Sequence, residues 1–175
     1  RPRTLKGSAV VSLMGGLMRA SETNSFDVST ELARTLGSEC YFVTAPVYCP
    51  SIESREILLT HSGVNEVMAR ARKSNLAIVS CGDLTPGTKM TSLSSIGSVR
   101  DRLPELKRLG AIGEILGTFL DANGRPVDHM LNQCVIALPP QDLKSIPHSI
   151  LISGGAYKAN IIQAILTAGY VNCLV

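Results

Sequence analysis

The sequence predicts an α/β fold in which a largely parallel sheet is covered by helices on both faces. Three observations predict it. The 175 residues suffice for one domain with a sizeable core, and 45% of them are hydrophobic. Aromatic residues make up only 4% of the chain and tryptophan is absent, so the core must be built from aliphatic side chains. Short apolar runs alternate with helix-like segments, which is typical of strand-helix-strand units.

Six short apolar runs, several of them rich in β-branched residues, are the predicted strands. They cover residues 9–14, 40–45, 76–81, 134–138, 149–152 and 171–175. Runs of this length with little polar alternation are typical of strands buried on both faces. Their alternation with helices favours a parallel sheet.

Four segments predict helices because apolar residues recur in them at helical spacing. The first begins near residue 27, two more follow residues 51 and 63, and the clearest covers residues 156–168. Gly37 and Gly169 follow the first and the last of these segments as stop signals.

A β-hairpin is expected beside the parallel sheet. Residues 116–120 and 127–131 predict two short strands, and the Asp-Ala-Asn-Gly segment at 121–124 can supply the turn between them. Residues 83–97 are rich in Thr, Ser and Gly, and we expect a long loop there, where binding residues are often found.

Composition and charge argue against several classes of protein. The 17 basic and 14 acidic residues give a net charge of +3 and form no basic run that would follow a nucleic-acid backbone. The five cysteines lack Cys-x-x-Cys spacing, which favours a reducing cytoplasm without disulfides or zinc. No apolar stretch is long enough to span a membrane, and the first residues lack the apolar segment of a secretory signal. The sequence therefore predicts a soluble, cytoplasmic domain with no membrane partner.

The main candidate for a binding site is Ser153-Gly154-Gly155 together with Lys158. These residues fall between a predicted strand and a predicted helix, where free glycine amides and the positive end of the helix could hold an anion. Lys158 stands in the first turn of that helix, where the dipole disfavours a cation unless a negative group is close. A bound phosphate would remove that conflict. An ordinary strand-to-helix turn with a solvated lysine fits the same residues.

Other polar positions extend this candidate site, and each has a structural alternative. Gly15 and Gly16 follow the first predicted strand, so they could approach a ligand at the carboxyl edge of the sheet or simply form a turn. Asp121 could accept hydrogen bonds from sugar hydroxyls or from turn amides. Thr91 and Asp83 lie in the long loop, whose hydroxyls and charges suit a polyol as well as they suit solvent.

The sequence gives little support to catalytic or metal chemistry. The histidines His61, His129 and His148 are scattered, and no Ser or Cys lies in a nucleophile elbow. No His, Asp or Glu group has metal-ligand spacing. We therefore expect no catalytic residues, no metal and no cofactor.

Three segments resemble the effector domain of SorC-type sugar-operon transcriptional regulators, a family related to the DeoR group. They are Leu-Met-Gly-Gly-Leu at residues 13–17, the run from Gly-Ala-Ile-Gly-Glu to Arg-Pro-Val at residues 110–127, and residues 146–175 with the Ser-Gly-Gly and Lys-Ala motifs. Their order and spacing resemble the family over essentially the whole chain.

The resemblance implies a Rossmann-like fold similar to that of ribose-phosphate isomerases and glucosamine-phosphate deaminases, used for sensing instead of catalysis. It implies that the effector is a phosphorylated sugar or a related small metabolite. It also implies that the effector alters operator DNA binding through rearrangement of a homo-oligomer, either a dimer or a tetramer.

The resemblance implies roles for particular residues. Lys158 is similar to the family's phosphate-contacting lysine, and Asp121 is similar to its acid that contacts ligand hydroxyls. Thr91 resembles a polar loop residue that faces the ligand. Gly15 and Gly16 resemble the backbone that lines the pocket.

The resemblance departs from the family in two respects. Met14 stands where some members that bind bisphosphates carry Arg, so a monophosphate is expected. Residues 1–175 resemble the effector domain alone, truncated at both ends, so the helix-turn-helix domain and the first strand of the effector domain would precede residue 1.

Two other functions remain open from the sequence. One is an enzyme on the same fold, a sugar-phosphate isomerase or deaminase with Asp121 or Asp83 as the proton carrier or Lys158 as an imine-forming amine. The other is a purely structural oligomerisation module.

Overall fold

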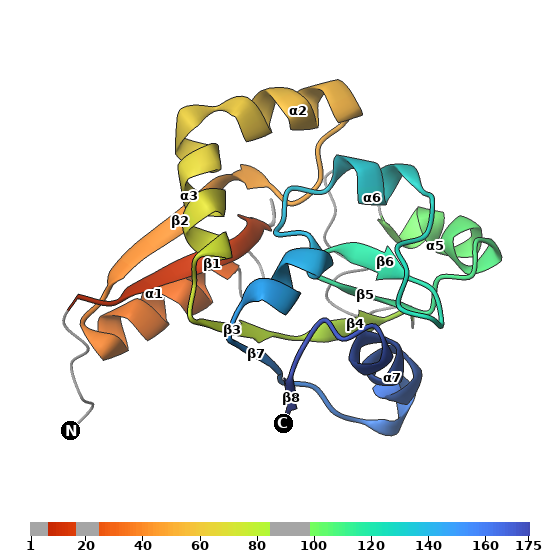
Figure 1. Cartoon of the computed structure of the whole chain (residues 1–175). Helices are drawn as coiled ribbons and strands as arrows, with labels where there is room; N and C mark the ends of the chain where they lie inside the picture. The colour runs from red at the N-terminus through yellow and green to blue at the C-terminus, as the bar shows by residue number, and fades with distance from the viewer. Residues whose placement is uncertain (1–6, 17–24, 85–98) are drawn as a thin grey trace.

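The computed structural model of the chain describes residues 7–16, 25–84 and 99–175, and Figure 1 shows how their elements are arranged. Along the chain the elements are β1 (Ala9–Gly16), α1 (Ser25–Leu36), β2 (Glu39–Pro46), α2 (Ile52–Thr60), α3 (Ser62–Arg72), β3 (Leu76–Val79), β4 (Cys81–Asp83), α5 (Val99–Arg108), β5 (Gly113–Ile115), β6 (Thr118–Leu120), α6 (Met130–Cys134), the 3₁₀ helix η1 (Pro140–Ser145), β7 (His148–Leu151), the 3₁₀ helix η2 (Ala156–Lys158), α7 (Ala159–Thr167) and β8 (Cys173–Leu174).

The strands form three small sheets. β1 and β2 pair in parallel, with Ala9 opposite Glu39. β3, β7 and β8 form a second parallel sheet, in which Leu76 lies opposite His148. β4, β5 and β6 form an antiparallel sheet. The fold is therefore mixed α/β with mostly parallel sheets, as the alternation of runs and helices predicts.

The predicted strand over residues 76–81 is divided in two. β3 ends at Val79 and pairs with β7, whereas β4 begins at Cys81 and pairs with β5. One apolar run therefore serves two sheets, because the chain passes from the parallel to the antiparallel sheet at a single residue, Ser80.

The predicted strand over residues 134–138 forms only isolated bridges. Met14 bridges Ala137 and Tyr48 bridges Val135, both in the antiparallel sense. This segment runs between the end of β1 and the chain that follows β2. The expectation of a regular strand here is wrong, because neighbouring backbone groups of the segment bond to different partners.

A tight hairpin joins β5 and β6, but not with the strands that the sequence predicts. Leu116 and Gly117, expected to be extended, form the turn with φ values of 51° and 76°. Two successive positive φ values match the twist of paired strands. Residues 127–131 are not a strand: Leu120 bridges Pro126 and the chain then enters α6.

Helices form at all four predicted places. The break between α2 and α3 is His61, whose Nδ1 accepts a hydrogen bond from the Gly63 amide at 3.3 Å. The predicted helix over residues 156–168 begins as η2 and continues as α7. α5, α6 and η1 have no counterpart in the sequence prediction.

Most of the buried apolar side chains among the described residues belong to one large core, which contains Phe119, Leu138 and Leu151. A smaller cluster around Val43 and Met68 packs α3 against β2.

Within the part of the chain that the structure describes, other elements pack on just one face of the sheet of β3, β7 and β8. Ala77 and Val79 of β3 are buried, but Leu76 and Ile78 on the opposite face are 50% and 51% exposed. Alternating exposure of this kind is typical of a sheet with one solvated face. The expectation of helices on both faces is thus not met for this sheet.

Candidate ligand-binding site

A trough of about 1360 Å³ lies along β1 and β3. One long wall consists of residues 7–14, which are most of β1 and the two residues before it. The other consists of residues 76–79 of β3. Past the carboxyl end of β3 the lining continues with a group of residues that we call the polar end of the trough: Cys81, Gly82, Glu114, Leu116 and Lys158. Small-molecule pockets measure about 300–1000 Å³. A small metabolite would therefore fill only part of the trough. The polar end holds the charged groups Lys158 and Glu114, and Arg70 and Lys73 line the trough outside it.

Lys158 is the positive group of the polar end. It closes η2 and is half-buried at the N-terminus of α7, which has neither an acidic residue in its first turn nor a side-chain cap. Within the described residues Lys158 forms no ion pair, and its Nζ lies 5.9 Å from the centroid of the Tyr157 ring. The positive end of the helix and the ammonium group thus act together on the same space.

Gly154 and Gly155 are exposed next to Lys158. A Cβ on Gly154 would have no heavy atom within 4 Å, whereas Gly155 has a φ of 101° and a Cβ there would meet the Tyr157 ring at 2.6 Å. Their amides donate no hydrogen bond to any described residue. Open backbone donors beside a lysine are a suitable set for an anion such as phosphate.

Glu114 is the negative group of the polar end, and it is only 7% exposed. Its Oε2 accepts a hydrogen bond from the Gly117 amide at 2.9 Å. Its Oε1 lies against Gly82, since a Cβ on that glycine would be 2.5 Å from it. Burial raises the pKa of Glu114 to about 7, although the amides of Gly117 and Gly82 and the charge of Lys158 each act to lower it.

Two further contacts hold the walls of the polar end. The Tyr48 hydroxyl donates to the Gly117 carbonyl at 2.7 Å and fixes the turn between β5 and β6. The Cys81 thiol lies 3.3 Å from the Ser153 hydroxyl, and burial raises the pKa of this thiol. Cys81 therefore stays protonated and lines the site as a small, mostly apolar group.

The structure gives Gly15 and Gly16 a packing role. Both are buried at the end of β1, and the Gly15 amide donates to the Ile136 carbonyl at 2.8 Å. A Cβ on Gly15 would lie 2.6 Å from the Ala45 carbonyl oxygen, and one on Gly16 would lie 2.4 Å from the Phe26 ring. Neither glycine lines the trough, so the structure does not bring them to Lys158.

Asp121 serves the turn that follows β6. Its Oδ1 accepts hydrogen bonds from the amides of Asn123 and Arg125, both at 2.8 Å. That turn packs on the last part of α7, because a Cβ on Gly124 would lie 2.5 Å from the Ala164 carbonyl oxygen. Lys158 stands at the other end of this helix of nine residues, about 14 Å long. The structure thus does not bring Asp121 together with Lys158.

The remaining sequence candidates lie in or next to the long loop. Thr91 falls within residues 85–98, outside the described residues, so its expected role stays a prediction. Asp83 is buried at the end of β4.

Glu114 is the site residue that the sequence reasoning missed. A signal for it exists: the acid stands in Gly-Ala-Ile-Gly-Glu-Ile-Leu-Gly at residues 110–117, with no other polar side chain in that run. Charged residues are rarely fully buried without partners. A lone acid in an apolar run therefore indicates a buried carboxylate with backbone partners or a function.

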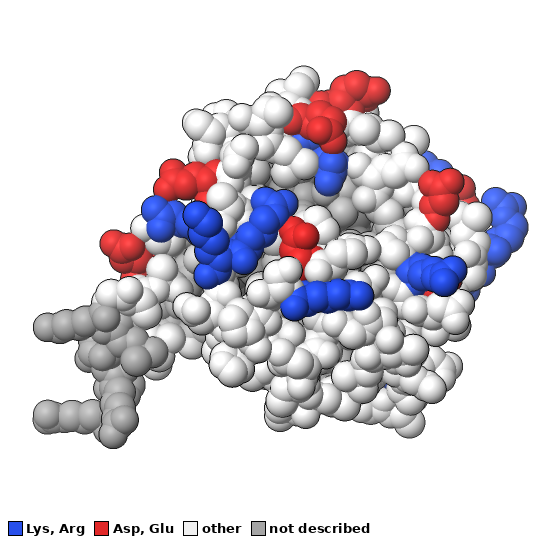
Figure 2. All heavy atoms as spheres, viewed as in Figure 1, with Lys and Arg blue, Asp and Glu red and all other residues white. Residues whose placement is uncertain are grey.

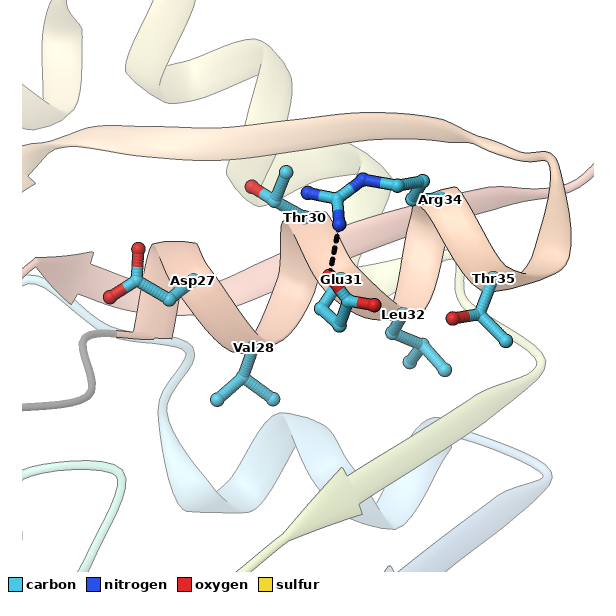
Figure 3. A pocket seen from close by; sticks show the side chains of 7 residues that line it. All are labelled: Asp27, Val28, Thr30, Glu31, Leu32, Arg34 and Thr35. Carbon is cyan, nitrogen blue, oxygen red and sulfur yellow. Dashed lines mark hydrogen bonds and ion pairs between the residues drawn. The ribbon is translucent and has the colours of Figure 1, made fainter.

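A second hollow, of about 690 Å³, lies along α1 (Figure 3) and shares Val28 and Leu32 with the trough. Val28 and Leu32 provide its apolar side chains, and Glu31 and Arg34 pair with each other across one turn of the helix. Since all its lining residues come from one helix and its two acids, Asp27 and Glu31, outnumber its single base, Arg34, we do not consider it the site of an anionic ligand.

Acidic and basic side chains are mixed on the face shown in Figure 2. Arg70 pairs with Glu66 at 2.9 Å and Arg72 pairs with Asp142 at 2.8 Å. On this face no stripe of one sign runs across the molecule as it would for a nucleic-acid backbone.

The described residues contain no group of three potential metal ligands. Among the same residues, no helix has the length and apolar character needed to cross a membrane.

Comparison with known proteins links the chain to transcriptional regulators. Residues 1–175 match a family model described as "Putative sugar-binding domain". The erythritol catabolism regulatory protein EryD of Brucella abortus is 30% identical over 161 residues, which cover 91% of this chain and 49% of EryD. The chain spans about half the length of the curated relatives it matches.

Two solved structures share the fold. A DeoR family transcriptional regulator from Listeria monocytogenes superposes with a TM-score of 0.88 at 23% identity, covering 99% of this chain and 68% of that one. The full-length sorbitol operon regulator SorC from Klebsiella pneumoniae gives a TM-score of 0.85 at 19% identity, covering 100% of this chain and 56% of that one.

Proposed function

This chain belongs to the sugar-binding domain family of SorC- and DeoR-type transcriptional regulators, and we propose on that premise that it senses a phosphorylated sugar or a related small metabolite for such a regulator. The observation that carries the proposal is Lys158, a half-buried cation at a helix N-terminus, without an ion pair among the described residues and beside two free glycine amides.

In this proposal the phosphate lies between the Lys158 ammonium and the amides of Gly154 and Gly155. A charge-assisted hydrogen bond in a partly desolvated place contributes about 1.5–3 kcal/mol. The rest of the ligand extends into the trough past Leu116 and Met14, both of which line it. Since Met14 offers no positive charge for a second phosphate, the proposed ligand is a monophosphate.

The test is a thermal-shift series with two probes, ribose 5-phosphate and erythritol 4-phosphate, each beside its unphosphorylated form. Erythritol belongs in the panel because the relative with 30% identity is named as a regulator of erythritol catabolism. We expect the phosphorylated forms to raise the melting temperature and the free polyols to raise it much less. Equal shifts from both forms would contradict the phosphate anchor.

Lys158→Ala should remove most of the phosphate-dependent shift, because it deletes the charge that faces the anion. Lys107→Ala is the matched control, since Lys107 is exposed in the last turn of α5 and does not line the trough. If both variants respond to the probe like the wild type, Lys158 is only a solvated side chain.

For the whole protein we propose that the ligand favours one of two oligomer states that differ in affinity for operator DNA. Linkage requires such a difference, because a ligand that binds both states equally shifts nothing. The DNA-binding part would lie outside residues 1–175, and the site of action would be the cytoplasm.

EryD, the relative with 30% identity, is named as a regulatory protein, which favours a sensing role over an isomerase or deaminase. Of the three residues that the enzyme alternative names, Asp121, Asp83 and Lys158, the structure gives Asp121 a role in its own turn. Both backbone amides that donate hydrogen bonds to the Asp121 carboxylate belong to its own turn, and this turn is far from Lys158.

We also propose that the effector domain continues beyond residues 1–175 and that the added chain covers the trough. The trough is larger than a sugar phosphate needs, and Leu76, Ile78 and Val28 expose apolar side chains in its lining. In Figure 1 β1 and β3 run in the same general direction, and residues of both strands line the trough. A further strand parallel to both would join the two parallel sheets.

A further inference from the structure

We propose that Glu114 takes up a proton when an anionic ligand binds at Lys158, so that ligand binding in this domain is coupled to pH. The inference rests on the proposed anion site and adds the regulation of that site. It starts from the position of Glu114, a buried carboxyl that lines the trough together with Lys158 and is affected by the lysine charge.

Glu114 cannot turn away from an anion at Lys158. One of its oxygens accepts from the Gly117 amide at 2.9 Å, and the other lies against the backbone of Gly82. Gly117 is itself held by the Tyr48 hydroxyl at 2.7 Å. The carboxylate is therefore fixed between β4 and the turn that follows β5.

Few charged groups face this carboxyl. From η2 the charge of Lys158 acts on it, and it is the only described cation that does. From β4 the Cys81 thiol interacts with it, and the Asp83 carboxyl acts on the same thiol; the Tyr48 hydroxyl interacts with Glu114 from the chain after β2. Burial raises the pKa of both Cys81 and Tyr48, so neither group carries a charge near neutral pH.

A dianion at Lys158 changes the balance at Glu114. In the free domain the Lys158 charge partly stabilises the ionised carboxyl, whose pKa is about 7. A bound dianion neutralises that lysine and adds negative charge in a desolvated place, and two negative groups there raise the pKa of the weaker acid. The pKa of Glu114 in the complex is therefore higher than in the free domain.

The direction of the pH effect follows from this difference. Well below pH 7 Glu114 already holds its proton in the free domain, so anion binding takes up none. Above pH 7 the free carboxyl is ionised and must gain a proton on binding. Affinity for the anion should thus fall as pH rises above about 7, by up to about tenfold per pH unit for one coupled proton.

Sulfate is the probe for the test, because it stays a dianion throughout the neutral range and cannot itself exchange a proton. Calorimetric titration near pH 8 in two buffers of different ionisation enthalpy measures the protons taken up per sulfate bound. We expect an uptake approaching one proton near pH 8 and close to none near pH 6.

Glu114→Gln should bind sulfate with an affinity that does not change with pH and without proton uptake. Glu56→Gln is the matched control, because Glu56 is an exposed acid of α2 and should leave the proton uptake as in the wild type. If Glu114→Gln does not fold, NMR titration of the Glu114 carboxyl carbon in the wild type replaces it. Its pKa should rise when sulfate is added.

The outcomes separate this inference from the proposed function. Sulfate binding that depends on Lys158 but takes up no proton near pH 8 overturns the inference and leaves the anion site standing. An absence of binding by sulfate and by the sugar phosphates overturns both. Proton uptake that persists in Glu114→Gln assigns the proton to another group and also overturns the inference.

Discussion

At the scale of single residues, the two acids of the segment from 110 to 127 show what the sequence can and cannot assign. Asp121 stands before an Asn-Gly turn, and its side chain bonds to the amides of that turn, which is the structural alternative that the sequence left open. Glu114 shares the polar end of the trough with Lys158. Sequence spacing does not reveal this, because it depends on how η2 and α7 pack against β4. The sequence can propose Gly154, Gly155 and Lys158 as an anion site, because a helix start and nearby glycines are local features.

Glu114 should also make the stability of the domain depend on pH. Its pKa is about 7 in the folded domain against 4.5 in its ordinary state, so between these values the folded form holds a proton that the unfolded chain has lost. The stabilisation that comes from the protonated Glu114 is therefore fully present below about pH 4.5. The free energy of unfolding then falls by on the order of 3 kcal/mol as pH rises towards 7.

Urea unfolding at several pH values checks this expectation through the difference between wild type and Glu114→Gln, since the subtraction removes the other titrating groups. The free energy of unfolding of the wild type should fall relative to that of the variant between about pH 5 and pH 7. Parallel curves for the two proteins would show that the Glu114 carboxyl titrates as an ordinary exposed acid.

At the scale of elements, the sequence predicts helices and strands well where a segment has a single environment. β1, β2, β7 and the four predicted helices fall close to their expected places. The run at residues 76–81 serves two sheets, and the segment at 134–138 bonds to the ends of two strands instead of lying along one. Such divisions depend on partners far away in the sequence, so local patterns do not contain them.

The packing of α7 on the antiparallel sheet depends on the absence of a side chain at Gly113. A Cβ there would lie 2.5 Å from the Gly82 carbonyl oxygen and 2.6 Å from a side-chain carbon of Ile161 in α7. Gly113→Ala should therefore destabilise the domain by about 1–3 kcal/mol, because backbone and a buried side chain must both move. Denaturant unfolding measures the loss.

Gly63→Ala is the control for that variant. Gly63 lies in the first turn of α3, where a Cβ would have its nearest contact at 3.6 Å. Alanine is a better helix former than glycine, so this variant should be neutral or slightly stabilising. A loss of stability as large as that of Gly113→Ala would mean that glycine flexibility, not the close contact with α7, explains both results.

At the scale of the whole molecule, the described residues form two parallel sheets with no strand pairing between them, beside the antiparallel sheet of β4, β5 and β6. β1 and β3 belong to different sheets and both line the trough, where Leu76 and Ile78 of the edge strand β3 expose apolar side chains. Exposed strand edges with apolar side chains tend to pair with further chain. The proposed extension of the domain would therefore remove an exposed surface and join the sheets in one step.

Ile78→Lys tests this extension in the longer polypeptide that carries this domain. If further chain covers the trough, a lysine at position 78 loses its hydration there, and the melting temperature should fall by several degrees, as expected for about 1–3 kcal/mol. Ile57→Lys is the matched control, because Ile57 is 70% exposed on α2 and does not line the trough.

Hydrogen exchange of the backbone amides in the same longer polypeptide gives a second measurement. Slow exchange of β1 and β3 should be lost in Ile78→Lys and kept in Ile57→Lys. Equally small shifts from both variants, with fast exchange of the two strands in the wild type, would show that the trough stays open to solvent. Protection that appears only at high protein concentration would instead assign the covering strand to a second copy of the chain.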